Sequence, residues 1–94
     1  MNIKWLPEAK NDLSVIKNFI AQDNNLIAEQ VIAMLIISVR VLRDNPGVGR
    51  PGRVKHTKEL VLPSIPYTIP YRIKDGTVEI LRVLHQSRKW PSDL

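Results

Sequence analysis

Residues 67–80 read Tyr-Thr-Ile-Pro-Tyr-Arg-Ile-Lys-Asp-Gly-Thr-Val-Glu-Ile, and this stretch predicts a β-hairpin. Its first half carries an aromatic or aliphatic side chain at every second position, which is typical of a half-buried strand. Asp75–Gly76 is a pair that two-residue type I′ turns favour. A second strand is therefore expected from Thr77 to about Gln86.

The turn also predicts which side chains share a face of the hairpin, because opposed residues lie on the same face. The face expected to meet the rest of the core carries Tyr67, Ile69, Tyr71, Ile73, Val78, Ile80 and Leu84. The open face is expected to carry Thr68, Arg72, Lys74, Glu79, Leu81, Val83 and His85. Arg82 falls on the apolar side and is expected to reach the rim. Pro70 lacks an N–H, which favours an edge or a bulge, and a bulge would shift this register.

The residues before the hairpin predict a short strand and two helices. Asn2–Trp5 is compatible with a strand, and Pro7 suits the first turn of a helix over about 7–22. Asp23 to Asn25 interrupt this helix and offer a cap for a second one over about 26–43. The second helix is apolar on several faces, so it is either packed between two layers or left with an exposed apolar side.

Length and composition restrict the class of protein. The 94 residues predict one domain, 1–94, and the absence of cysteine excludes disulfides, a thiolate nucleophile and a zinc–sulfur site. With two histidines, neither a metal site nor a cofactor is expected. The N-terminus lacks the apolar run of a signal peptide, so a cytoplasmic location is expected. The apolar stretch 31–42 is too short to span a bilayer, so no membrane partner is expected.

The positive charge is concentrated in the second half of the chain. Residues 1–49 hold five cations and five anions, whereas residues 50–94 hold nine cations and four anions, which is the whole net charge of +5. Residues 47–57 form a loop dense in glycine, proline and cations, without the Gly-Lys-Ser/Thr of a phosphate-binding loop. This asymmetry favours a binding surface for a polyanion or an acidic protein, although a solvated basic face is the alternative.

The second half also resembles a known family. Gly49-Arg-Pro-Gly-Arg53, Tyr67-Thr-Ile-Pro-Tyr-Arg72 and a strand ending in Leu84-His85, with Arg88 three residues beyond the histidine, are similar in order and spacing to the RelE/ParE superfamily of toxins. The resemblance covers nearly the whole chain. It implies an α+β fold in which a short N-terminal strand and a two-helix hairpin pack on one face of a small antiparallel sheet.

The resemblance further implies the toxin of a type II toxin–antitoxin pair, as used in plasmid stabilisation. A cognate antitoxin would neutralise it and would also provide the only contact with operator DNA. ParE-like members poison DNA gyrase, and RelE-like members cut mRNA on the ribosome. The Leu-His-x-x-Arg ending is more ParE-like, and Thr68 stands where RelE-like nucleases carry an arginine. The sequence therefore favours a gyrase inhibitor without catalytic residues, and the mRNA endonuclease is the alternative.

Each reading assigns roles to particular residues. A metal-free nuclease needs a base, a cation at the phosphorane and an acid, for which the candidates are His85, Arg72, Arg88 and Tyr71. For a docking toxin, the candidate target-binding residues are Arg50, Arg53, Lys55, Arg72, His85, Arg88, Lys89 and Trp90. Structural alternatives remain: Arg72 could only pair with Glu79, Tyr71 could only pack under the helices, and Glu59 could either order the basic loop or be exposed.

Overall fold

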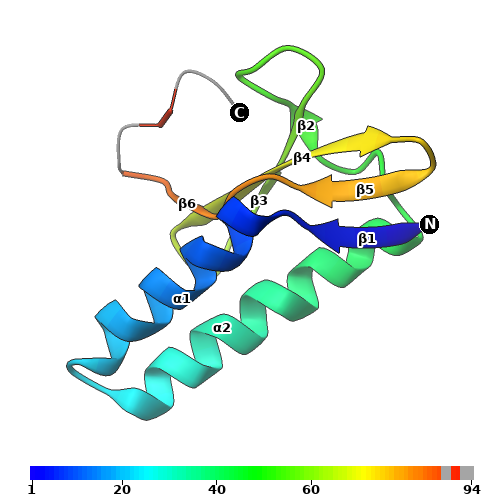
Figure 1. The fold of residues 1–94 in the computed structure, drawn as a ribbon. Coiled ribbons are helices and arrows are strands. Elements are labelled where there is room, and N and C mark those ends of the chain that lie inside the picture. Colours follow the sequence, from blue (N-terminus) through cyan, green and yellow to red (C-terminus); the bar gives the residue numbers. More distant parts are fainter. Residues whose placement is uncertain (88–89, 92–94) are drawn as a thin grey trace.

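The computed structural model describes residues 1–87 and 90–91 as a helical hairpin packed against a mixed sheet (Figure 1). The helices are α1 (Pro7–Ala21) and α2 (Asn25–Arg40), and a 3-10 turn, η1 (Val41–Arg43), follows α2. The described strands are β1 (Asn2–Trp5), β2 (Arg50–Pro51), β3 (Lys58–Val61), β4 (Tyr67–Lys74), β5 (Thr77–Ile80) and β6 (Leu84–His85). The α+β class predicted from the sequence is confirmed.

The two helices begin and end close to the predicted positions. Pro7 occupies the first turn of α1, where its missing N–H leaves no hydrogen bond unmade. The side chain of Asn24 caps α2 by accepting a hydrogen bond from the Ile27 N–H at 3.0 Å. The last three residues of the predicted second helix form η1 instead of continuing the α-helix.

The sheet has the strand order β1-β5-β4-β3-β2, and β6 pairs with β4 beyond the end of β5. The ladders among β2 to β6 are antiparallel, as expected. The ladder between β1 and β5 is parallel, with Ile3 opposite Val78, so the expectation of a wholly antiparallel sheet was wrong at this edge. Parallel neighbours need a long connection, and α1, α2 and the other strands between β1 and β5 provide it.

The hairpin register predicted from the two-residue turn is confirmed. Lys74 lies opposite Thr77 and Tyr71 lies opposite Ile80. Asp75 and Gly76 both have positive φ angles, 51° and 74°, as a type I′ turn requires at its two central positions.

A bulge beside Pro70 divides the expected last strand into β5 and β6. Ile80 lies opposite Tyr71 and His85 lies opposite Tyr67, so this side of the ladder contains one residue more than β4. Pro70 has no N–H to offer, and its carbonyl accepts the Leu81 N–H at 3.0 Å. The extra residue turns His85 to the face of Tyr67, so the prediction that His85 lies on the open face was wrong.

The same shift affects Leu84, which the uninterrupted register placed on the helix side. Leu84 lies opposite Thr68 and therefore shares the Thr68 side of the ladder. Val83, predicted to lie on the open face, is 3% exposed and belongs to the main core cluster. The predicted pairing of faces thus holds up to Ile80 and changes after it. The expected exposure was wrong for Ile73, which is 44% exposed near the turn, and for Thr68, which is 1% exposed.

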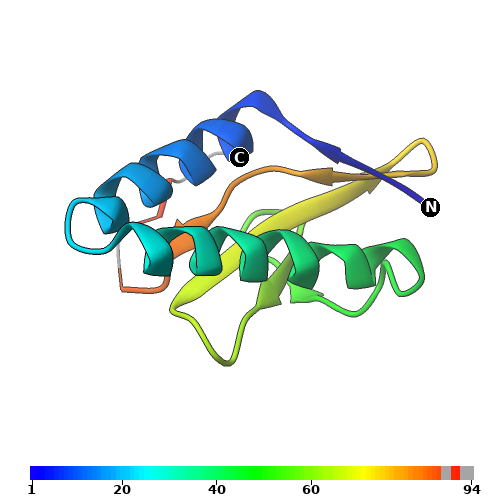
Figure 2. The ribbon, with the colours of Figure 1, turned by 90° about the horizontal axis from the view of Figure 1, so that it is seen from below.

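The core lies between the helical hairpin and one face of the sheet, and Figure 2 shows both helices running along that face. Leu35, Val39 and Leu42 are buried against a sheet surface formed by Ile69, Tyr71, Val78 and Ile80. By length and composition alone, the segment Asn25–Arg43 could also cross a membrane, a property that core helices of globular proteins share. Its packing on α1 and the sheet accounts for only one side of α2.

Candidate functional site

The basic loop between η1 and β3 is organised around one buried carboxylate. Glu59 is 2% exposed, and its Oε1 accepts hydrogen bonds from Nε and Nη2 of Arg50 at 3.1 and 3.0 Å. Its Oε2 accepts the backbone N–H of Arg53 at 2.8 Å. A buried carboxylate requires such partners. Of the two roles left open for Glu59, the structure supports ordering the loop.

Tyr71 on β4 holds the start of the same loop through its hydroxyl group. Its hydroxyl donates to the Pro46 carbonyl at 2.7 Å and accepts the Gly49 N–H at 2.9 Å. The approach is close, because a Cβ added at Gly49 would lie 2.6 Å from the tyrosine oxygen. Burial raises the pKa of the Tyr71 hydroxyl above its ordinary 10.0, opposed by the Gly49 hydrogen bond. Tyr71 thus packs under the helices, and its hydroxyl is hydrogen-bonded to Pro46 and Gly49. This agrees with the structural alternative given for Tyr71 above.

The loop meets the C-terminal segment through one stacked pair. The guanidinium carbon of Arg53 lies 3.7 Å from the centroid of the Trp90 ring, which is cation–π geometry. Arg50 and Arg53 each keep more than half of the side-chain surface exposed, and Lys55 is also exposed. Of the predicted cluster of loop and tail, Arg53 and Trp90 are thus in contact. Two other members of the cluster, Arg88 and Lys89, lie outside the described residues.

Arg72 lies on β4 and is held by a neighbour on β5. Its Nε donates to Oε1 of Glu79 at 2.6 Å, and this hydrogen bond is the main cause that lowers the pKa of Glu79. The cross-strand pair was expected from the register, and the structure contains it. Arg72 therefore has a structural partner, although part of its side chain remains exposed.

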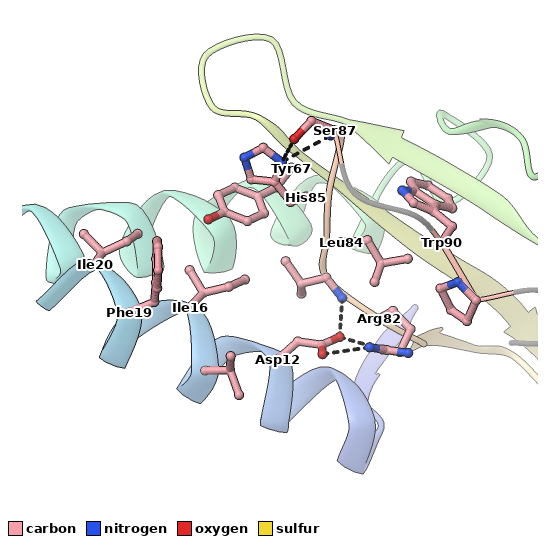
Figure 3. A pocket seen from close by; sticks show the side chains of 13 residues that line it. Asp12, Ile16, Phe19, Ile20, Tyr67, Arg82, Leu84, His85, Ser87 and Trp90 are labelled. Carbon is pink, nitrogen blue, oxygen red and sulfur yellow. Dashed lines mark hydrogen bonds and ion pairs between the residues drawn. The ribbon is translucent and has the colours of Figure 1, made fainter. Parts of the chain in front are cut away.

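His85 lies in a groove between α1 and residues 82–87 and 90–91 (Figure 3). Its ring meets Tyr67 edge to face, with ring centroids 5.3 Å apart. Its Nδ1 accepts the Ser87 N–H at 3.1 Å and lies 2.7 Å from the Ser87 hydroxyl oxygen. Because Nδ1 acts as an acceptor here, the neutral ring carries its proton on Nε2.

The groove has a volume of about 540 Å³ and is mostly apolar. α1 contributes Val15, Ile16 and Phe19, and Trp90 and Pro91 also line the groove. Val15 and Phe19 are 55% and 62% exposed, so a large apolar surface faces the opening. Such a concave apolar surface is suited to receive a peptide segment.

A partly buried ion pair holds the groove at the bulge. Asp12 on α1 accepts from Arg82 through two contacts of 2.7 and 3.0 Å, and it also accepts the Val83 N–H at 2.9 Å. The hydrogen bond that Arg82 donates to Asp12 is the main cause that raises the pKa of Arg82. Sequence reasoning placed Arg82 at the rim but missed Asp12, whose partner is 70 residues away. The only available signal was an arginine expected on an apolar face.

The described residues, 1–87 and 90–91, contain no preformed cluster of metal ligands. There, the side chains of His, Asp and Glu do not gather in groups of three or more that could hold an ion. The groups available are hydrogen-bond donors, cations and apolar surface, which serve binding directly.

Comparisons with known proteins agree with this architecture. Residues 3–90 match the family described as the ParE toxin of the type II toxin–antitoxin system parDE. Y4kP of Sinorhizobium fredii, named as a toxin, is 45% identical over 92 residues, which cover 98% of this chain and 95% of the relative. Toxin RelE2 of Caulobacter vibrioides is 31% identical over 86 residues, which cover 92% of this chain and 96% of the relative.

A solved structure shows the same fold. It is described as a chromosomal ParDE toxin–antitoxin system from P. aeruginosa, and it superimposes with a TM-score of 0.83 at 28% sequence identity. The match covers 90% of this chain and 95% of the other. The family match spans nearly all of the sequence, and the RelE/ParE resemblance predicted from the second half is confirmed. The chain therefore belongs to the ParE toxin family of type II toxin–antitoxin systems.

Proposed function

We propose that this toxin acts by docking on DNA gyrase and stalling it on cleaved DNA, with no catalytic residues of its own. The observation that carries the proposal is that the candidate groups for RNA cleavage do not converge among the described residues. In contrast, Arg53 of the basic loop stacks on the half-buried Trp90, and Arg50 and Arg53 keep more than half of their side-chain surface exposed.

The separation of the candidate catalytic groups follows from the strand register. His85 lies opposite Tyr67, four residues from Tyr71 along β4. At about 3.3 Å per residue, the two positions are about 13 Å apart. At one phosphodiester, the general base must reach the 2′-hydroxyl and the general acid the leaving oxygen, each within hydrogen-bond distance. The Tyr71 hydroxyl is moreover bonded to Pro46 and Gly49.

The position that would carry an arginine in a RelE-like nuclease also argues against cleavage. Thr68 occupies it and is 1% exposed, so it presents no cation to a substrate. Arg72, the next cation along β4, is bonded to Glu79. These contacts support a docking toxin over an mRNA endonuclease.

The loop offers what a protein-docking surface needs. Arginine and tryptophan are the residue types most enriched at interaction hot spots, and Arg53 and Trp90 are stacked together here. Glu59 holds the backbone at Arg53, so less ordering entropy is lost on binding. With gyrase as its target, the toxin would act in the cytoplasm.

The cognate antitoxin is expected to occupy the groove beside α1. The exposed Val15 and Phe19 provide apolar contact area, and the Asp12–Arg82 pair holds the groove at the bulge. A segment lying there would contact Trp90, which stacks on Arg53 of the docking loop. Neutralisation would then follow from covering one end of the target-binding surface.

The test is a supercoiling and cleavage assay with purified gyrase and purified toxin. Loss of supercoiling with accumulation of cleaved plasmid is the expected result. Lys55→Glu should weaken inhibition because it reverses a charge in the loop, and Lys17→Glu on α1 is the matched control. Unchanged supercoiling with the unaltered toxin, or equal effects of the two variants, would contradict the proposal.

A further inference from the structure

The outer side of α2 carries an apolar stripe that the fold leaves uncovered. Leu35 and Val39 point from the helix into the core, whereas Ile37, between them in sequence, is 62% exposed. The exposed large apolar residues of this helix and its C-terminal turn are Leu26, Ile27, Met34, Ile37 and Val41. They occupy the side opposite the core, since helical residues advance by about 100° each. Scattered exposed residues need no explanation, but five large apolar residues along one side of a helix, interrupted by Gln30, indicate an interaction surface.

The spacing along this stripe suits contact with another helix. Leu26, Gln30, Ala33 and Ile37 follow one another at intervals of four, three and four residues, which is the pattern of a helix-pairing seam. Ala33 is small, which allows close approach of a second helix axis. With its 16 residues, α2 provides a seam about 24 Å long.

The charges beside the stripe determine which partner fits. Glu29 lies toward the N-terminal end of α2 and Arg40 at its C-terminal end, and both are exposed. They are eleven residues apart, about three helical turns, so they flank the same edge of the stripe. The stripe is thus apolar in its middle, negative at one end and positive at the other.

We propose that this face is an interface between two copies of this chain, with the two α2 helices antiparallel. A two-fold axis between Met34 and Leu35 places Glu29 of each copy beside Arg40 of the other. A two-fold interface must be complementary to itself, and reversal of the second helix gives this property here. A parallel pair would instead leave Glu29 of one copy eleven residues along the helix axis from Arg40 of the other, so these ion pairs could not form.

The interface would leave the toxin's other surfaces accessible. The groove is lined by residues of α1, β4, 82–87 and 90–91, and the basic loop follows η1 and precedes β3. A dimer through α2 would therefore present two docking loops and two antitoxin grooves. Each copy would retain its own binding sites.

Sedimentation of the full chain at increasing concentration tests the dimer directly. The unaltered protein should change from a mass of 10.8 kDa to twice that value as concentration rises. Ile37→Asp should weaken dimerisation about a hundredfold, because it buries a charge at the seam. Val15→Asp is the matched control, since Val15 is an exposed helical residue on α1, and it should leave the dimer unchanged.

Charge reversal provides a second test, which distinguishes a specific interface from nonspecific apolar association. Glu29→Arg alone and Arg40→Glu alone should each raise the dissociation constant about tenfold, and the double variant should restore it. A monomer at all concentrations, or no rescue by the double variant, would overturn the proposal. Protection of α2 from hydrogen exchange only in the antitoxin complex would assign the face to the antitoxin and also overturn it. These measurements involve no gyrase, so they succeed or fail independently of the proposed target.

Discussion

Replacing Glu59 by Gln should disorder the docking loop, because this carboxylate joins three donors. The substitution keeps the size of the side chain but turns one acceptor oxygen into an amide donor. That donor would face either the Arg50 guanidinium or the Arg53 N–H, both of which are donors themselves. Hydrogen bonds to a charged group contribute about 1.5–3 kcal/mol each, and the exposure of both arginines favours the lower end. A loss of about 2 kcal/mol in the free energy of unfolding is expected.

Thermal unfolding and hydrogen exchange would measure this effect. About 2 kcal/mol corresponds to a decrease in Tm of roughly 8–16 °C for a domain of this size, and the Arg53 amide should exchange faster. Glu79→Gln is the matched control, because Glu79 pairs with Arg72 on the hairpin and should give a smaller decrease. If both variants lower Tm equally and the Arg53 amide stays protected, Glu59 does not order the loop.

Three further changes test other contacts. Tyr71→Phe removes two hydrogen bonds and should cost about 2 kcal/mol in urea unfolding. Because burial raises the folded-state pKa of Tyr71, the contribution of this residue to stability should decline as pH rises above 10.0. A similar decline in stability of the Phe variant above that pH would argue against Tyr71 as the cause. Asp12→Asn should lower Tm and reduce antitoxin affinity, because it weakens the ion pair that holds Arg82 at the groove. An unchanged affinity would show that the antitoxin does not bind in the groove. Gly52→Ala should destabilise the loop, since a Cβ there would lie 2.9 Å from the Thr57 carbonyl oxygen, and an unchanged melting curve would refute that crowding.

Local patterns in the sequence were sufficient to predict the helical hairpin and the β4–β5 hairpin. The Asp75–Gly76 turn determined the register because a two-residue loop leaves no freedom in pairing. Asn24 capped the second helix at the break that had been predicted. These features depend on residues close together in the chain.

Contacts between distant residues could not be predicted in the same way. The parallel pairing of β1 with β5 depends on the path of the whole chain, and nothing in Asn2–Trp5 specifies it. Pro70 signalled a possible bulge but not its effect on His85, which required knowledge of where β5 ends. The Asp12–Arg82 pair joins α1 to the bulge, so neither residue indicates the other in the sequence.

The candidate site was partly predicted by the clustering of charge. The basic loop and Trp90 meet as expected, because Arg53 stacks on the indole ring. The role of Glu59 depended on its burial, which a single glutamate after a run of cations does not reveal. His85 was also assigned to the docking surface, and the bulge places it in the groove that Trp90 lines as well.

The most direct test of docking without catalysis is a map of DNA breaks and transcript ends in one culture after toxin induction. Docking without catalysis predicts DNA breaks that depend on gyrase, together with intact transcripts. Transcripts cut inside codons, without gyrase-dependent breaks, would contradict it.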